Sequence, residues 1–171
     1  IEKFFFNDKS EFPFLVAGIG DDAAILEVPD NQQLVVTTDT LNAGIHFLFQ
    51  DNNCLEENSC SALPFDIGYK AAAVNLSDLG AMGAKPWCVS LALSLPEINE
   101  AWLKKFSEGL FSLLNQFNVP LIGGDLTRGP LSITLTAQGL VDSGKAIRRS
   151  TAMVGDDIYV SGELGGAAYT L

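Results

Sequence analysis

Carboxylates that lie beside glycines, or in and at the ends of apolar segments, are the side chains of this sequence most able to do chemistry. They are Asp21, Asp22, Asp39, Asp78 and Asp125. Adjacent carboxylates repel each other, and burying one is costly unless a cation neutralises it. Mg2+ prefers oxygen ligands, keeps several waters and is usually shared with substrate phosphates. The set therefore favours a site for a magnesium–polyphosphate complex.

Each of these aspartates also has a purely structural explanation. Asp39 or Asp125 alone is typical of a cap or turn, because Asp side chains bond nearby backbone amides. Asp78 lies inside a helical pattern, where Asp is a weak helix former, and Asn75 shares its face three residues earlier. A solvated helix face would explain that pair, although residues 71–82 contain few other polar side chains. The metal hypothesis therefore depends on the whole set.

Two nucleotide-binding motifs bear on this hypothesis. The pattern G-x-x-x-x-G-K-[ST] is absent from the sequence, so the chain is not a P-loop enzyme. Residues 18–23, GIGDDA, match the dinucleotide pattern G-x-G-x-x-A. That pattern needs a helix N-terminus to receive a pyrophosphate, whereas AAILEV at 23–28 predicts a strand. The match is accidental unless a metal ion lies between the carboxylates and the phosphates.

The composition supports a folded domain with an acidic surface. Hydrophobic residues make up 47% of the 171 residues and charged residues only 18%, so a substantial core can form. The formal net charge is −11, from 21 acidic and 10 basic side chains. Nucleic acid and anionic membranes are therefore poor partners, because binding a phosphate backbone requires Lys and Arg. The surplus acid either keeps the domain soluble or collects divalent metal.

No segment has the pattern of a membrane span or a secretory leader. The longest apolar runs stay below the ~18 residues of a span, and no basic, apolar leader opens the sequence. Cys54, Cys60 and Cys88 are odd in number and form no C-x-x-C pattern. Lone His46 completes no zinc pattern. We expect a reduced, cytoplasmic chain that contacts no membrane.

Residue patterns predict an alternation of strands and helices. Strands are expected at 33–38, 87–94, 119–124, 131–141 and 157–162. One helix is expected over 66–83, where Gly83 can end it before Pro86. A second helix with Asn99 as N-cap is predicted by an apolar repeat at intervals of 4, 4, 3 and 4: Trp102, Phe106, Leu110, Leu113 and Phe117. This order predicts an α+β fold, a mixed, largely antiparallel sheet with helices packed on one face.

Changes in composition predict the domain organisation. Residues 1–150 are expected to form an N-terminal domain, and residues 151–171 the start of a second, truncated one. Residues 49–65 lack periodicity and predict a loop that is functional or mobile. Because the chain begins with Ile1 and its last residues resemble an opening helix, we expect a piece of a longer protein.

Five segments together resemble one enzyme family, the thiamine-monophosphate kinases. They are GIGDDAAI (18–25), TTDTLNAGIHF (37–47), YKAAAVNLSDLGAMGAKP (69–86), GGDLTRG (123–129) and GDDIYVSGELG (155–165). That family belongs to the superfamily of aminoimidazole ribonucleotide synthetase, selenophosphate synthetase and the hydrogenase maturation protein HypE. The reactive N-terminal Cys of selenophosphate synthetase has no counterpart here, since Cys54 is the first cysteine.

The resemblance implies ATP-dependent phosphorylation of thiamine monophosphate to thiamine diphosphate, by Mg2+-assisted direct phosphoryl transfer. It also implies a homodimer whose N-terminal domains pair through their sheets. Residues matching metal-binding positions are Asp22, Asp39, Asp78 and Asp125, with Thr38. Residues matching nucleotide-binding positions are Thr37, Gly124, Asp125 and Arg149. His46 matches a position on the thiamine-phosphate side.

The residue chemistry agrees with this implication. Phosphoryl transfer to a phosphate needs no covalent nucleophile, because catalysis is alignment plus neutralisation of charge on the moving group. Such an enzyme should be rich in carboxylates and poor in His and Cys, as this chain is. Arg149 has a planar fork suited to phosphate, but Arg148 could take that role, or both could lie in a solvated turn. His46 could equally be a packed or surface histidine.

Departures from the family pattern keep alternatives open. Leu126 replaces the first Thr of the usual GGDTTRG, so a hydroxyl role there is absent. The motif favours Asp22 over Asp21 as the ligand, but spacing does not decide between them. We expect this fragment to fold but to lack a complete catalytic site. The alternatives are a sibling ATP-dependent synthetase and a non-catalytic metal- or nucleotide-binding dimerisation module.

Overall fold

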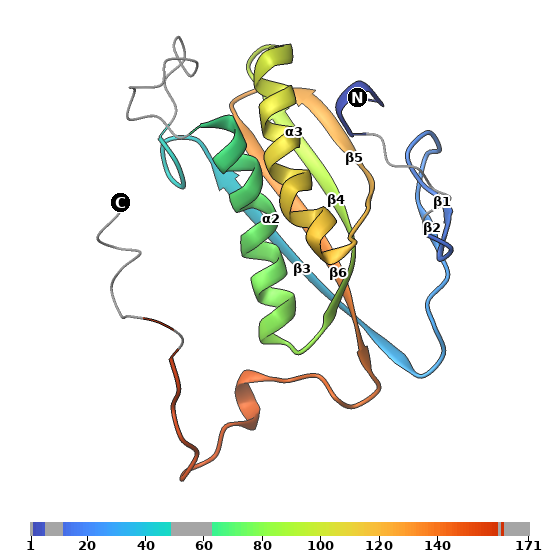
Figure 1. Cartoon of the computed structure of the whole chain (residues 1–171), viewed down its shortest axis with the longest axis vertical. Coiled ribbons are helices and arrows are strands. Elements are labelled where there is room, and N and C mark those ends of the chain that lie inside the picture. Colours follow the sequence, from blue (N-terminus) through green and yellow to red (C-terminus); the bar gives the residue numbers. More distant parts are fainter. Residues whose placement is uncertain (1, 6–11, 49–62, 161, 163–171) are drawn as a thin grey trace.

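A four-stranded sheet forms the centre of the computed structural model, which describes residues 2–5, 12–48, 63–160 and 162 (Figure 1). Its strands, in spatial order, are β3 (Gln32–Asn42), β6 (Ser132–Asp142), β4 (Lys85–Leu95) and β5 (Leu121–Arg128). β3 and β4 both pair antiparallel with β6, whereas β5 runs parallel to β4. The sheet is therefore mixed and mostly antiparallel, within the α+β class that the sequence predicts.

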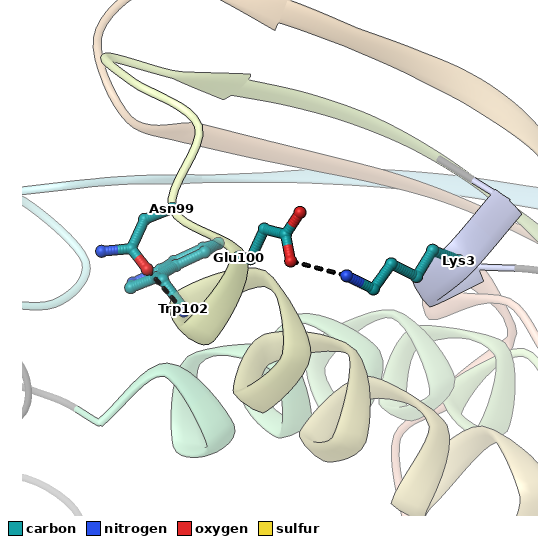
Figure 2. Close-up of polar contacts among 4 residues, drawn as sticks. All are labelled: Lys3, Asn99, Glu100 and Trp102. Carbon is teal, nitrogen blue, oxygen red and sulfur yellow. Dashed lines mark hydrogen bonds and ion pairs between the residues drawn. The ribbon is translucent and has the colours of Figure 1, made fainter.

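Two helices cover one face of this sheet, α2 (Pro64–Ala81) and α3 (Glu100–Leu114) (Figure 1). α3 begins where the sequence predicts, because the Asn99 side chain accepts a hydrogen bond from the Trp102 backbone amide at 3.0 Å (Figure 2). The rings of Trp102 and Phe106 stack at 5.1 Å and are buried against the sheet. A short 3-10 turn, Asn115–Phe117, ends this helical segment. The predicted apolar face is thus confirmed as the core face from Trp102 to Leu113, but Phe117 lies in the 3-10 turn and is 51% exposed, so its place in the repeat is wrong.

Glycines set the distance between the two helices. A Cβ atom on Gly68 of α2 would collide with the carbonyl oxygen of Phe106. A Cβ atom on Gly109 of α3 would collide with the carbonyl oxygen of Phe65. The helices therefore touch backbone to backbone, and this contact fixes where α2 carries its polar side chains over β3.

The N-terminal segment packs in two places. α1 (Glu2–Phe5) lies against α3, where the rings of Phe5 and Phe106 meet edge to face at 6.4 Å. A small antiparallel pair, β1 (Leu15–Ala17) and β2 (Ile25–Leu26), lies on the other side of β4 and β5. Apolar side chains of residues 12–26 form a second buried cluster there with strand residues: Phe12, Leu15, Trp87, Cys88 and Ile122. Lys3 of α1 makes an exposed ion pair with Glu100 at 2.6 Å, a contact worth little by itself (Figure 2). Through the second buried cluster, residues 12–26 reach the β5 edge of the sheet.

The face of β3 and β6 that lies opposite the helices carries hydroxyl groups and exposed apolar side chains. Thr38 and Thr136 share a hydrogen bond of 2.9 Å across the two strands. Leu34 and Val36, on the same face of β3, are 45% and 54% exposed. No described segment covers this part of the sheet, which we call the open face.

Some predicted elements differ from those observed. β5 continues through Asp125 to Arg128, because residues 123–128 keep their parallel pairing with β4, so the predicted strand end at Asp125 is wrong. Residues 157–160 form no strand, since a strand needs a partner and none pairs with them among the described residues. Most of the predicted 49–65 loop, residues 49–62, lies outside the described residues. None of the described helices combines the length and hydropathy needed to cross a bilayer.

Candidate functional site

A cavity of about 530 Å³ lies at the β5 edge of the sheet, and we call it the β5 pocket. Residues 18–24 form one wall and residues 121–126 form another. Asp21, Asp22 and Asp125 all line it, so two distant acidic motifs do meet here. Their exposed carboxylates are hard oxygen donors, and Mg2+ in nucleotide sites commonly uses one or two carboxylates plus phosphate oxygens. The donor chemistry of the pocket therefore fits Mg2+.

Two glycines shape this pocket. Gly20 has a φ of 109°, a conformation that side chains rarely adopt, and it directly precedes the two aspartates. The Asp21 amide donates a 3.2 Å hydrogen bond to the Gly18 carbonyl, which closes the turn. At Gly124 a Cβ atom would collide with the Leu91 carbonyl oxygen. The backbone at Gly124 is consequently bare, and a ligand can approach it closely.

A second polar group lies at the opposite edge, where α2 packs on β3, and we call it the β3 group: Thr37, Asp39 and Asp78. The Thr37 hydroxyl donates a 2.9 Å hydrogen bond to the Asp78 carboxylate. Asp39 lies on the same face of β3 as Thr37, because side chains alternate along a strand. Thr38 therefore points the other way, to the open face, where it bonds Thr136. The threonine pair is split between two faces of the sheet.

Asn75 lies one helical turn before Asp78 and is 1% exposed. Its amide nitrogen donates to the Ala71 carbonyl at 3.0 Å, but its Oδ1 atom has no partner among the described residues. Leaving a buried acceptor unpaired costs roughly 1–3 kcal/mol. Asn75 and Asp78 share a face of α2, as the sequence predicts. Asn75 is buried on that face, whereas Asp78 is exposed.

The β5 pocket and the β3 group do not merge within one chain. β6 and β4 lie between β3 and β5, and three strand spacings of about 4.8 Å separate the two edges by about 14 Å. Among the described residues, no cluster of three or more His, Cys, Asp or Glu side chains is arranged to hold a metal ion. The expectation that all four predicted ligands gather in one pocket is not met in the single chain.

His46 and Arg149 lie outside both groups. His46 is in the turn that follows β3, and its Nδ1 atom accepts a 2.9 Å hydrogen bond from the Asn42 amide. Arg149 begins an exposed 3-10 turn, Arg149–Thr151. Its neighbour Arg148, not Arg149, lines a cavity of about 510 Å³ beside β3. Of the two arginines left open by the sequence, Arg148 thus lies against the sheet.

Comparison with known proteins identifies the family. Residues 20–141 match the model described as AIR synthase related protein, N-terminal domain, which is more than half of the chain. The chain belongs to this family. Curated relatives of this AIR-synthase-related domain include the thiamine-monophosphate kinases of Salmonella typhimurium and Haemophilus influenzae, at 49% and 52% identity. These matches cover 98% and 88% of this chain but only 48% and 42% of the relatives. The chain thus spans about half their length.

Solved structures agree with this assignment. The thiamine-monophosphate kinase of Stenotrophomonas maltophilia superposes with a TM-score of 0.81 at 52% identity, over 94% of this chain and 47% of that one. A structure of AaThiL complexed with AMPPCP and TMP gives 0.58 at 29% identity, over 72% and 37%. The hydrogenase maturation protein HypE gives 0.59 at 20% identity, which shows the fold alone. The family resemblance predicted from the motifs is confirmed.

Three contacts in this AIR-synthase-related domain were missed by the sequence reasoning. Lys70 of α2 donates a 2.7 Å hydrogen bond to the His46 carbonyl, and Asn42 binds the His46 ring. The sequence did point to the Lys70 contact, because Lys70 is the single basic residue of α2 in an acidic chain. The 3.4 Å contact of the buried Cys88 thiol with Gln138 was missed as well. Burial raises the pKa of Cys88 to about 12, so this thiol is no nucleophile.

Proposed function

We propose that this chain is the nucleotide- and metal-binding half of a kinase that phosphorylates thiamine monophosphate to thiamine diphosphate with ATP. The observation that carries the proposal is 49% identity to thiamine-monophosphate kinases over 98% of the chain. AaThiL, a structural relative, has been solved with both AMPPCP and TMP. Four of the five motifs that carry the resemblance contribute residues to the β5 pocket or to the β3 group.

The proposed chemistry is direct transfer between two phosphates. Asp22 and Asp125 would hold Mg2+ in the β5 pocket, where bare backbone at Gly124 would lie against the nucleotide phosphates. Bound Mg2+ supplies neutralisation of charge on the transferred phosphoryl group. Because the reacting groups are both anions, alignment by fixed residues provides the remainder of the catalysis.

The β3 group supplies the second half of the proposed site. Asp39 and Asp78 would bind metal. The Thr38 hydroxyl points away from these two carboxylates, so as a metal ligand it would act on the open face. Thr37 orients the Asp78 carboxylate through their 2.9 Å hydrogen bond, and it is also our candidate for nucleotide contact. Arg149 would bind nucleotide phosphate, and His46 would bind the acceptor. These residues would act by binding metal, nucleotide and acceptor in fixed positions. None is proposed as a covalent nucleophile.

We further propose that the chain acts as a homodimer paired through the open face of the sheet. Exposed Leu34 and Val36 beside the hydroxyl pair Thr38–Thr136 form a surface that a second copy could cover. In a two-fold dimer each copy uses the same surface, so the β3 edge of one copy can meet the β5 edge of the other. The partner would thereby bring the two acidic groups together.

The proposed domain organisation assigns residues 1–150 to ATP and Mg2+ binding and dimerisation, and residues 151–171 to the start of a second domain. Support comes from Ile158 and Tyr159, which are 93% and 87% exposed although they are large and apolar. A packing partner would cover them, and the relatives are about twice as long as this chain. The free, buried thiol of Cys88 is consistent with the reducing cytoplasm that we propose as the location.

The test is an assay of the full-length protein with ATP, Mg2+ and thiamine monophosphate. We expect thiamine diphosphate and ADP in equal amounts, and no product when Mg2+ is chelated. Nucleotide binding without turnover would instead support a non-catalytic dimerisation module. Turnover with a different acceptor alone would support a sibling synthetase. Either result would contradict the proposal.

A further inference from the structure

A buried amide side chain lies in the middle of the face of α2 that packs on the sheet. Ala71, Asn75 and Leu79 are four residues apart, so they share one face of the helix, and each is 1% exposed or less. Leu79 lies over β6, because a Cβ atom placed on Gly139 would be 3.1 Å from the Leu79 Cδ2 atom. Asn75 is thus an amide between apolar neighbours, at a position where packing alone would favour an apolar side chain.

One end of the Asn75 amide is bonded and the other is not. Nδ2 donates to the Ala71 carbonyl at 3.0 Å, whereas Oδ1 has no hydrogen-bond partner among the described residues. Exchanging the two atoms would not satisfy the group, because an oxygen facing the Ala71 carbonyl would bring two acceptors together. A buried acceptor is commonly satisfied by an ordered water, which itself binds about two to four polar groups. Such a water needs a second polar partner near Oδ1.

The strand beside Asn75 supplies this partner. α2 and β3 run in opposite directions, because Asp78 binds Thr37 while an earlier turn of α2 binds the turn that follows β3. Measured from the bond to Thr37, Asn75 lies about 4.5 Å along the helix and Asp39 about 6.6 Å along the strand, in the same direction. Both β3 side chains face α2. Asn75 thus lies at a level between them, where one water can reach both Oδ1 and the half-buried Asp39 carboxylate.

We infer that Asn75 is a positioning residue, which orients the Asp39 carboxylate through one buried water. The water donates one hydrogen bond to Asn75 Oδ1 and the other to Asp39, so a single molecule satisfies both acceptors. Asp39 is thereby oriented from α2, as Asp78 is oriented from β3 by Thr37. The inference rests on the proposed function, in which Asp39 binds metal. Hydrogen-bond partners behind a metal-binding carboxylate fix its direction and raise the metal affinity.

The first test is a crystal structure of the full-length protein without metal or nucleotide. We expect a water within about 2.7–3.2 Å of both Asn75 Oδ1 and an Asp39 carboxylate oxygen. In Asn75→Leu this water should be lost, and the Asp39 side chain should occupy more than one rotamer. A protein donor at Oδ1, or no water that joins Oδ1 to Asp39, would overturn the inference.

The second test compares two replacements of Asn75 by Mn2+ titration of the full-length protein, followed by electron paramagnetic resonance. Leucine keeps the volume but removes the acceptor. Serine loses volume, but its hydroxyl can donate to the Ala71 carbonyl and accept from the water. We expect the Mn2+ affinity to fall about tenfold in Asn75→Leu and less than about threefold in Asn75→Ser.

Chemical denaturation of the same two variants separates positioning from packing. Asn75→Ser should be the less stable of the two, because it leaves a cavity, while Asn75→Leu fills the site with an apolar side chain. The order of stability is therefore opposite to the expected order of Mn2+ affinity. An affinity that follows stability, with Asn75→Ser the weaker binder, would assign Asn75 to packing alone and contradict the inference.

Trp102 supplies the matched control. Its Nε1 atom is also buried without a partner among the described residues, but it lies on α3, which contributes nothing to the β3 group. Trp102→Phe should lower the stability and leave the Mn2+ affinity unchanged, and an equal loss of affinity there would contradict a specific role for Asn75. None of these measurements needs ATP or thiamine monophosphate, so they decide the positioning of Asp39 even if the kinase assay fails.

Discussion

The two edges of the sheet carry acidic residues in opposite ways. The β5 pocket is concave and built from backbone, with Gly20 and Gly124 making room and exposed carboxylates at its wall. The β3 group is built from side chains of a strand and a helix, and Asp78 is already oriented by Thr37. One edge offers space for a phosphate chain and the other offers aligned charge. Neither is a complete phosphoryl-transfer site in one chain.

The largest effect is expected in the β5 pocket, at Gly124. Gly124→Val forces a side chain against the Leu91 carbonyl and should lower the free energy of unfolding by about 3 kcal/mol or more. It should also abolish nucleotide binding. Chemical denaturation and calorimetric titration with an ATP analogue measure the two effects.

Gly123 is the matched control, because no heavy atom lies within 4 Å of a Cβ placed there. Gly123→Ala should change the stability by less than about 1 kcal/mol. Equal destabilisation by the two substitutions would show that the close approach at Gly124 does not shape the pocket.

An intermediate effect is expected in the β3 group. Thr37→Val removes the hydrogen bond to Asp78, so the carboxylate loses its orientation and turnover should fall about tenfold. The stability should change by about 1 kcal/mol or less, since Asp78 is exposed and regains water. Steady-state kinetics at several Mg2+ concentrations measure the loss, and Thr37→Ser should restore the rate. A full rate in Thr37→Val would leave Thr37 without an orienting role.

The smallest effect concerns Cys88, in the cluster beneath the β5 pocket. Burial raises its pKa from 9.0 to about 12, so the folded state keeps the proton that the unfolded chain releases. The stabilisation from this proton is full below pH 9 and is lost as the pH rises toward 12. Cys88→Ala should flatten the decline of unfolding free energy across that range. An identical decline in both proteins would assign the alkaline effect to other groups.

Local patterns predicted the elements well and their grouping poorly. The repeat from Trp102 to Leu113 and the Asn99 cap determine α3 almost by themselves, because helix periodicity and capping are local. The split of Thr37 and Thr38 also follows from strand alternation. The position of β6 between β3 and β4 does not follow from any local pattern, since it depends on pairing between distant segments. Asp125 and Asp78 were therefore expected together although they lie at opposite edges.

The central claim is that the β3 group of one copy completes the β5 pocket of another. Full-length Asp78→Asn and Asp125→Asn should each be inactive alone. Co-expressed, they form mixed dimers in which one of the two sites carries neither substitution, so about a quarter of the wild-type activity should return. No recovery in mixed dimers verified by differential tags would show that each chain carries its own complete site, and would contradict the account.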